Sequence, residues 1–241
     1  MPLAVSKGAS YDVPSMMGLE ELHFLVEEYR DMWRDHGLWN ILPGLIRTEG
    51  GIPSSKFLEK TRDEIGDCRR CGLCHARKQI VFGNGNPKAD LVFIDEAPGL
   101  ANDTIGLPLA GETGSLLTKI IEAMGYTVNG VYVTSLVKCC PPKNRPPSPE
   151  EIATCFPFLK AQLTAIGPRI IVAFGETTAR VLTGKVGSAT SLRGRFHPLV
   201  WDPSVSVMTT FSPAYLLTTP TAKRQVWEEM KLVKSRLARS Q

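Results

Sequence analysis

The sequence lacks a long apolar segment. No uninterrupted apolar run approaches the roughly 18 residues of a membrane-spanning helix. Residues 1–17 also lack the basic and then apolar arrangement of a secretory signal. These two absences argue against a membrane partner and against export, so we expect a cytoplasmic protein.

The sequence also lacks a strong excess of charge of one sign. Lys and Arg number 28 against 24 Asp and Glu, which gives a formal net charge of +4. This small excess permits a nucleic-acid partner without requiring one. The apolar share of 43% and the charged share of 22% are ordinary for a globular chain, and 241 residues are enough to bury a core.

Paired histidines of the mixed zinc-finger type are absent, because no His-x₃₋₅-His spacing occurs. The cysteines are Cys68, Cys71, Cys74, Cys139, Cys140 and Cys155. In a reducing compartment, clustered cysteines indicate metal rather than disulfides. The C-x-x-C spacing favours an all-cysteine metal site and is found with both zinc and iron–sulfur clusters. Buried free thiols are the alternative.

Strand patterns alternate with helix patterns from residue 88 onward. Short apolar strands are predicted over 91–95, 131–136, 169–174 and 205–211, and helices over 113–124, 148–165, 176–182 and 221–239. Ser148 and Glu151 form a capping box at the start of one helix. This alternation predicts an α/β fold, a three-layer α/β/α arrangement with a central, mostly parallel four-stranded sheet.

The N-terminal part of the chain shows a different pattern. Apolar residues recur at helical spacing over residues 18–36, and residues 42–55 form a connector rich in Gly and Pro. We therefore expect a helical arm and linker over 1–55 and a main domain with the metal site over 56–241.

Binding sites in parallel sheets form outside the carboxyl ends of the strands. Residues 95–112, 135–147, the turn at 175 and residues 212–220 are therefore candidate site segments. Glu96 follows the first predicted strand in the run DEAPG. Its carboxylate could orient water or stabilise a cationic transition state, or it could cap the next element.

Two of these segments have distinctive compositions. Residues 138–147 combine three cations with several prolines, which suits either a phosphate-contacting surface or a solvated loop. Residues 212–217 carry a large apolar tip. That tip is either a wedge that enters a base stack or the first turn of the next helix.

Seven ordered motifs lie within a stretch that runs from about residue 68 to residue 237. They are CxxC, VFGNGNPKADLVFIDEAPG, GLPLAGETGSLLTKII, VYVTSLVKCCPPKNRPPSPEE with Cys155, IIVAFG, LRGRF and FSPAYLL. Together they resemble the family 4 uracil-DNA glycosylases, the iron–sulfur branch of that superfamily. The predicted N-terminal helix lies outside the resemblance.

The resemblance implies a uracil-DNA glycosylase-like fold and a base-excision DNA repair enzyme. Such an enzyme hydrolyses the N-glycosidic bond of uracil or another modified base, flipped out of single- or double-stranded DNA. We expect it to act as a monomer. One alternative is a catalytically silent iron–sulfur relative that binds DNA with the same fold. Another is a metal protein whose partner is not a nucleic acid.

The resemblance also implies a cofactor. Four of the cysteines would hold a [4Fe-4S] cluster, with zinc as the less favoured occupant; they are Cys68, Cys71, Cys139 and Cys155. Cys74 and Cys140 are then additional cysteines. In this family the cluster is regarded as structural and organises loops that touch DNA.

The family's reactive and base-binding positions carry over unevenly. The implied catalytic residues are Glu96, Asn102 and Ser212, and the implied substrate-binding residues are Ala97, Asp103, Leu109 and Ser135. Asp95 replaces a glycine before Glu96, and Asn102 stands where an acidic residue is common. Leu109 replaces a phenylalanine that stacks on uracil, Ser135 an asparagine that reads its polar edge, and Ser212 a histidine that stabilises its anion.

The implied DNA contacts come from the loops at one side of the domain. They are Lys138, Arg145, Arg193, Tyr215 and Leu216, with Lys143 and Arg195 on the same loops. His197 is the histidine nearest in sequence to the altered motif at Ser212, so we consider it as a replacement for the missing histidine.

Overall fold

The computed structural model describes residues 54–239. The predicted helix over residues 18–36 lies outside this range, so the arm stays a prediction. The described helices are α2 (Ser54–Ile65), α3 (Leu100–Ile105), α4 (Gly111–Ala123), α5 (Pro149–Ile166), α6 (Glu176–Thr183), α7 (Ala189–Leu192), α8 (Pro213–Thr218) and α9 (Lys223–Ala238). The described strands are β1 (Asn84–Gly85), β2 (Leu91–Asp95), β3 (Tyr132–Ser135), β4 (Ile170–Phe174), β5 (Phe196–Leu199) and β6 (Asp202–Thr210).

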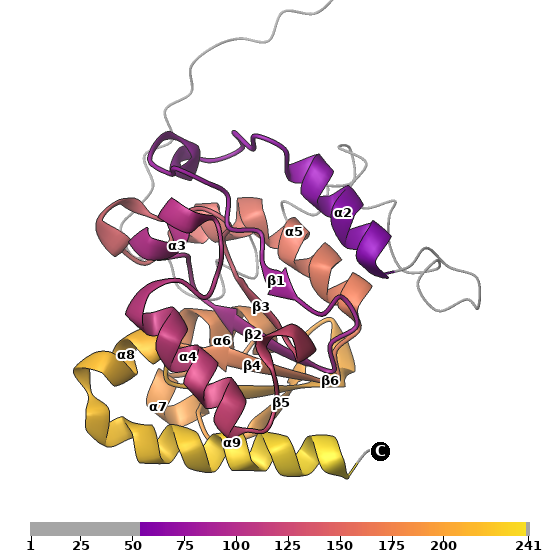
Figure 1. The fold of residues 1–241 in the computed structure, drawn as a ribbon, viewed down its shortest axis with the longest axis vertical. Helices are drawn as coiled ribbons and strands as arrows, with labels where there is room; N and C mark the ends of the chain where they lie inside the picture. Colours follow the sequence, from indigo (N-terminus) through magenta and orange to yellow (C-terminus); the bar gives the residue numbers. More distant parts are fainter. Residues whose placement is uncertain (1–53, 240–241) are drawn as a thin grey trace, which may run out of the picture.

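The sheet is mixed, with the strand order β1-β3-β2-β4-β6-β5 (Figure 1). Its four central strands, β3, β2, β4 and β6, are parallel, and they are the four that the sequence predicts. The predicted count of four is corrected to six, because β1 and β5 pair antiparallel at the two edges. β1 has two residues, and β5 contains Pro198 beside a register shift, so neither has the apolar run that marks a strand.

Helices cover both faces of the sheet, which confirms the predicted three layers (Figure 1). Along β2 the side chains alternate between the faces. Val92 and Ile94 pack into one core with residues of α2, α5 and α6. Leu91 and Phe93 pack into a second core with residues of α4, α8 and α9. Because both faces are buried, the central strands read as continuous apolar runs.

Local sequence signals explain where the longest predicted helix begins and ends. Ser148 caps α5, its hydroxyl accepting from the Glu151 N–H at 3.3 Å, while the Glu151 carboxylate accepts from the Ser148 N–H at 2.7 Å. The helix ends at Gly167, whose φ of 63° is in the left-handed region that glycine adopts readily. The predicted capping box is therefore confirmed.

Two short helices lie in segments that the sequence assigned to site loops. α3 falls within the predicted loop 95–112, and α8 forms the predicted tip at residues 212–217. Each helix has six residues, too few for a clear periodic pattern. For the tip, the structure supports the helix-turn alternative. Over residues 54–239, no helix has the length and apolar character needed to cross a membrane.

Candidate functional site

Four cysteines from three separate segments line one cavity, which we call the cysteine cavity. Cys68 and Cys71 follow α2, Cys139 follows β3, and Cys155 lies in α5. The other lining residues are Ile65, Leu73, Arg77, Ile80, Lys138, Thr154 and Phe158. These four are the cysteines that the resemblance assigns to the cluster, and Cys74 and Cys140 are not among the lining residues.

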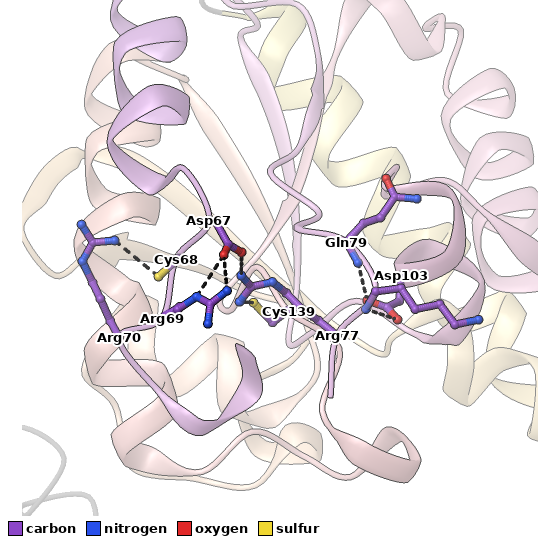
Figure 2. Close-up of polar contacts among 9 residues, drawn as sticks. Asp67, Cys68, Arg69, Arg70, Arg77, Gln79, Asp103 and Cys139 are labelled. Carbon is purple, nitrogen blue, oxygen red and sulfur yellow. Dashed lines mark hydrogen bonds and ion pairs between the residues drawn. The ribbon is translucent and has the colours of Figure 1, made fainter. Parts of the chain in front are cut away.

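Nitrogen donors surround the sulfur atoms of this cavity. Arg77 Nη1 lies 3.4 Å from Cys139 Sγ, and Arg70 Nη1 lies 3.4 Å from Cys68 Sγ (Figure 2). The Lys138 N–H lies 3.3 Å from Cys155 Sγ. Donors of this kind stabilise thiolate ligands and hold them in place. The donor set therefore suits an anionic, sulfur-ligated group.

Burial disfavours the ionised form of three of these cysteine thiols. Burial raises the pKa of Cys139 to about 11 and that of Cys155 to about 12, and it also raises the pKa of Cys71. A metal binds the thiolate, so binding here would release protons. Among residues 54–239, no three His, Cys, Asp or Glu side chains converge on the position of a single ion. The four cysteines nevertheless line one and the same cavity.

A second cavity, of about 40 Å³, lies at the carboxyl ends of β2 and β3; we call it the strand-end cavity. Its lining residues are Val81, Phe93, Asp95, Ala97, Pro98, Asn102, Pro108, Thr113, Gly114, Leu117, Val133, Thr134, Ser135, Phe174 and Pro213. The wall is mostly apolar with a few polar groups, as is usual for small-molecule sites. Of the predicted reactive and base-binding residues, it includes Ala97, Asn102 and Ser135.

Asp95 is a titratable group on this wall. Burial raises the pKa of its carboxyl to about 7, although the residue as a whole keeps partial exposure. The Glu96 N–H, which donates to Asp95 Oδ1 at 2.8 Å, lowers the pKa, and the charge of Glu96 raises it. The family resemblance marks Asp95 as a departure from the pattern and implies no role for it.

Glu96 is not among the residues that line the strand-end cavity, and its carboxylate contacts the start of α6. Its Oε1 accepts a hydrogen bond from the Thr177 N–H at 3.0 Å. Gly175, with a φ of 83°, makes room for this contact, because a Cβ there would lie 2.7 Å from Glu96 Oε1. Of the two roles predicted for Glu96, the structure shows the contact expected of a capping residue, and a catalytic role stays a prediction.

Asn102 and Asp103 are buried in α3 and bond to nearby backbone. Asn102 Oδ1 accepts from the Gly99 N–H at 3.0 Å, and its Nδ2 donates to Leu107 O at 2.9 Å. Asp103 accepts from the N–H groups of Lys78 and Gln79, at 2.9 and 3.3 Å (Figure 2). Both side chains therefore shape the loop, and Asp103 ties it to the segment beside the cysteine cavity.

The three substituted base-contact positions lie around the same strand ends. Ser135 is buried, and its hydroxyl donates to Val137 O at 2.7 Å. Ser212 is the N-cap of α8, where its hydroxyl accepts from the Tyr215 N–H at 3.2 Å. Leu109 is half-buried between α3 and α4, beside the lining residue Pro108. Neither Leu109 nor Ser212 is among the lining residues.

Two predicted DNA contacts are wrong as surface contacts. Lys138 is only 2% exposed, and its Nζ donates to Thr134 Oγ1 at 2.7 Å and to Ser135 O at 2.6 Å. Burial lowers the pKa of its ammonium to about 7. Leu216 is 1% exposed and belongs to the core between the sheet and α9. Neighbours on the same short helix, Tyr215 and Leu217, are the exposed large apolar side chains of the tip.

The predicted cationic contacts differ in how they are engaged. Arg145 Nη2 lies 2.6 Å from Glu151 Oε1, and the Arg145 side chain is 45% exposed. Arg193 Nη2 lies 2.5 Å from the buried Glu229, and its guanidinium stacks over the Phe211 ring at 4.6 Å. Arg193 is therefore a bracing residue in this structure. Lys143 and Arg195 are exposed.

His197 does not take the place of the histidine missing at Ser212. It is buried on β5, and its Nε2 lies 2.9 Å from Leu192 O. It is not among the residues that line the strand-end cavity.

Sequence reasoning missed the charged residues that surround the two cavities. Arg70 lies between the cysteines of the C-x-x-C pair, and Arg77 follows Cys74 by three residues. That proximity was a usable signal for donors to sulfur. No such signal marks the burial of Asp95, because an acidic residue after an apolar strand is usually a solvated loop residue.

Comparisons with known proteins show which family the chain belongs to. A family model described as the Uracil DNA glycosylase superfamily matches residues 82–231. The Type-4 uracil-DNA glycosylase of Sulfurisphaera tokodaii is 37% identical over 185 residues, 73% of this chain and 83% of that protein. The enzyme of the same name from Saccharolobus solfataricus is 37% identical over 187 residues, which are 75% of this chain and 87% of that protein. The Type-4 uracil-DNA glycosylase of Thermotoga maritima is 38% identical over 183 residues, which are 75% of this chain and 94% of that protein.

Proposed function

We propose that this chain, which belongs to the type-4 uracil-DNA glycosylases of the Uracil DNA glycosylase superfamily, excises uracil or a related modified base from DNA. The family resemblance predicted from the motifs is thereby confirmed. The observation that carries the proposal is the strand-end cavity, which has a mostly apolar wall with polar groups at Asp95, Asn102 and Ser135. This cavity would hold a base extruded from the duplex.

The reaction breaks the bond between the sugar and the base, and water adds to the sugar. Positive charge develops on the sugar and negative charge on the departing base, so both are stabilised by groups placed in advance. Glu96 is our candidate for the carboxylate that faces the sugar, since it follows the cavity residue Asp95. Its contact with the Thr177 N–H would hold it in one orientation.

The cysteine cavity would hold a [4Fe-4S] cluster through Cys68, Cys71, Cys139 and Cys155. Shared lining of one cavity and the nitrogen donors at the sulfur atoms support this assignment. When bound, such a cluster supplies rigid cross-links between three chain segments. Arg77 would link the cluster site to the loop that carries Asp103. Arg77 contacts Cys139, and the next two residues, Lys78 and Gln79, donate their N–H groups to Asp103.

DNA is the proposed macromolecular partner. Exposed Lys143, Arg145 and Arg195 would contact phosphates, and exposed Tyr215 and Leu217 on α8 would contact bases next to the flipped one. We propose that the protein acts as a monomer in the cytoplasm on single- or double-stranded DNA.

Base release from a uracil-containing oligonucleotide tests the function. Glu96→Gln removes the charge and keeps an oxygen that can accept from Thr177, so we expect activity to fall by about 10² or more with little change in stability. The exposed Glu59→Gln on α2 is the matched control. Ser212→His restores the family's donor, and we expect it to raise the rate.

The outcomes separate the proposal from its alternative. If the starting protein releases the base and Glu96→Gln does not, the result supports a working glycosylase with an altered cavity. If neither the starting protein nor Ser212→His releases uracil or any other modified base from single- or double-stranded DNA, the proposed activity is wrong. A purified protein without iron or acid-labile sulfide would refute the cluster separately.

A further inference from the structure

The strand-end cavity contains an acid at a position where the family has glycine. Asp95 is the last residue of β2 and pairs with Ser135 of β3 in the parallel register. By strand alternation its side chain is on the same face as Phe93, which also lines the cavity. Asp95 is the one titratable residue among those lining this cavity in the described chain.

One oxygen of this carboxyl is free to meet a ligand. Oδ1 accepts from the Glu96 N–H at 2.8 Å. Oδ2 has no hydrogen-bond partner among residues 54–239. Burial and the adjacent charge of Glu96 favour the protonated form of Asp95, so they raise the pKa of its carboxyl to about 7. A neutral acid can donate a hydrogen bond, and a carboxylate cannot.

The charged groups on the elements around Asp95 are Glu96, Asp103, Glu112, Lys138 and Glu176. Four of them have partners of their own. Glu96 accepts from Thr177 N–H, Asp103 from the backbone of residues 78 and 79, and Lys138 donates to Thr134 and Ser135. Glu176 pairs with Arg180 at 2.5 Å, and Glu112 is exposed in the first turn of α4. None of these groups occupies Asp95 Oδ2.

We infer that Asp95 is a specificity-determining residue which, as a neutral acid, donates a hydrogen bond to a carbonyl oxygen of the base in the strand-end cavity. The inference rests on the proposed function and narrows its substrate class to oxo-bases, the class that deamination produces. Ser135 lies opposite Asp95 in the register, and its hydroxyl is already used by Val137 O, so Asp95 replaces the donor that the family's asparagine supplies.

The protonation state of Asp95 then controls the rate. As the bond from the sugar to the base breaks, the bonding electrons move onto the base and its carbonyl oxygen gains negative charge. A neutral Asp95 stabilises that charge through the hydrogen bond and keeps its own proton. An ionised Asp95 removes the donor and adds a negative charge beside the departing base, so the reaction slows.

A pH profile of single-turnover uracil release tests this inference. For the starting protein we expect a plateau below about pH 7 and a fall of about tenfold per pH unit above it. Asp95→Asn keeps a donor that does not titrate, so its profile should stay flat between pH 7 and 9. Asp90→Asn is the matched control, because Asp90 precedes the same strand at its opposite end and is exposed; it should follow the starting protein.

A second measurement does not depend on catalysis. Infrared difference spectra of the starting protein minus Asp95→Asn should show a protonated carboxylic acid at pH 6 that disappears near pH 7, and its stretch should shift when free uracil is added. An acid that ionises below pH 5, or a stretch that uracil leaves unchanged, overturns the inference. So does an Asp95→Asn profile that keeps the fall above pH 7. A normal infrared result in a protein that releases no base refutes the proposed function and leaves the uracil contact supported.

Discussion

The cysteine cavity and the strand-end cavity share most of their apolar residues with different cores, and they differ in how closely they follow the family pattern. The cysteine cavity has all four predicted ligands, packed with the core that includes α2 and α5. The strand-end cavity is next to the core that includes α4 and α9, and residues in and around it depart from the pattern at Asp95, Leu109, Ser135 and Ser212. The scaffold is therefore preserved more completely than the surface that reads the base.

Two contacts connect the cavities. The segment after the C-x-x-C pair carries Arg77, which donates to Cys139, and then the two N–H groups that bind Asp103 of α3 (Figure 2). Lys138 lines the cysteine cavity and donates to Ser135 O, at the end of β3. We therefore expect the residues of the strand-end cavity to keep their positions only while the cysteine cavity is intact. The choice of base should not depend on the cysteine cavity.

The largest expected effect comes from the cysteine cavity. Cys155→Ser removes a ligand that joins α5 to two other segments, so we expect loss of iron, loss of the brown colour and a protein that fails to fold or aggregates. The reason is that the binding free energy of a structural metal group is also folding free energy. Visible absorption, iron content and thermal unfolding measure the change.

Cys74→Ser and Cys140→Ser are the matched controls for this change. Both residues lie next to ligands in the sequence but do not line the cavity. We expect each variant to keep its iron. If Cys74→Ser lost iron as completely as Cys155→Ser, the ligand assignment would need revision.

A smaller effect is expected at the brace behind α8. Arg193→Met removes the counter-ion of the buried Glu229 and the stacking over Phe211, and it leaves a carboxylate buried without its cation. We expect the free energy of unfolding in urea to fall by about 3 kcal/mol. Adding Glu229→Gln should recover part of the loss, because it removes the stranded charge.

The same variant decides whether Arg193 also contacts DNA. Its side chain is 18% exposed and engaged by Glu229, so Arg193→Met should leave the salt dependence of DNA affinity unaltered. Arg195 lies two residues further along the chain and is exposed. Arg195→Ala should reduce the slope of log DNA affinity against log salt concentration by about the value of one phosphate contact. A lower slope for Arg193→Met would restore the surface role that the sequence predicts.

The sequence predicts the central strands and the long helices well, because burial on both faces produces apolar runs and α5 carries its own capping box. The resemblance also singles out the four cysteines that line one cavity, and their role as ligands stays a prediction. It misplaces Lys138 and Leu216, because a cation in a polar loop and a leucine in an apolar tip look exposed in one dimension. Their burial follows from which helices pack over them, and that depends on distant residues.

The smallest expected effect concerns the missing aromatic ring. Leu109 lies half-buried beside the lining residue Pro108. Its backbone packs so closely on Gly114 that a Cβ added to Gly114 would clash with the Leu109 backbone. This close approach fixes the loop position, and the Leu109 side chain packs partly buried against the core that includes α4 and α9. Leu109→Phe should bring a ring to the cavity mouth and strengthen base binding by about 1 kcal/mol, or roughly fivefold in KM.

Steady-state base release with a thermal-unfolding control measures this change. A lower KM at an unchanged melting temperature would show that the scaffold still positions residue 109 for stacking, so the difference between the two cavities lies in side chains alone. An unchanged KM would mean that the loop itself has moved away from the base. The strand-end cavity would then differ from the family in backbone as well, and restoring single side chains would not recover uracil binding.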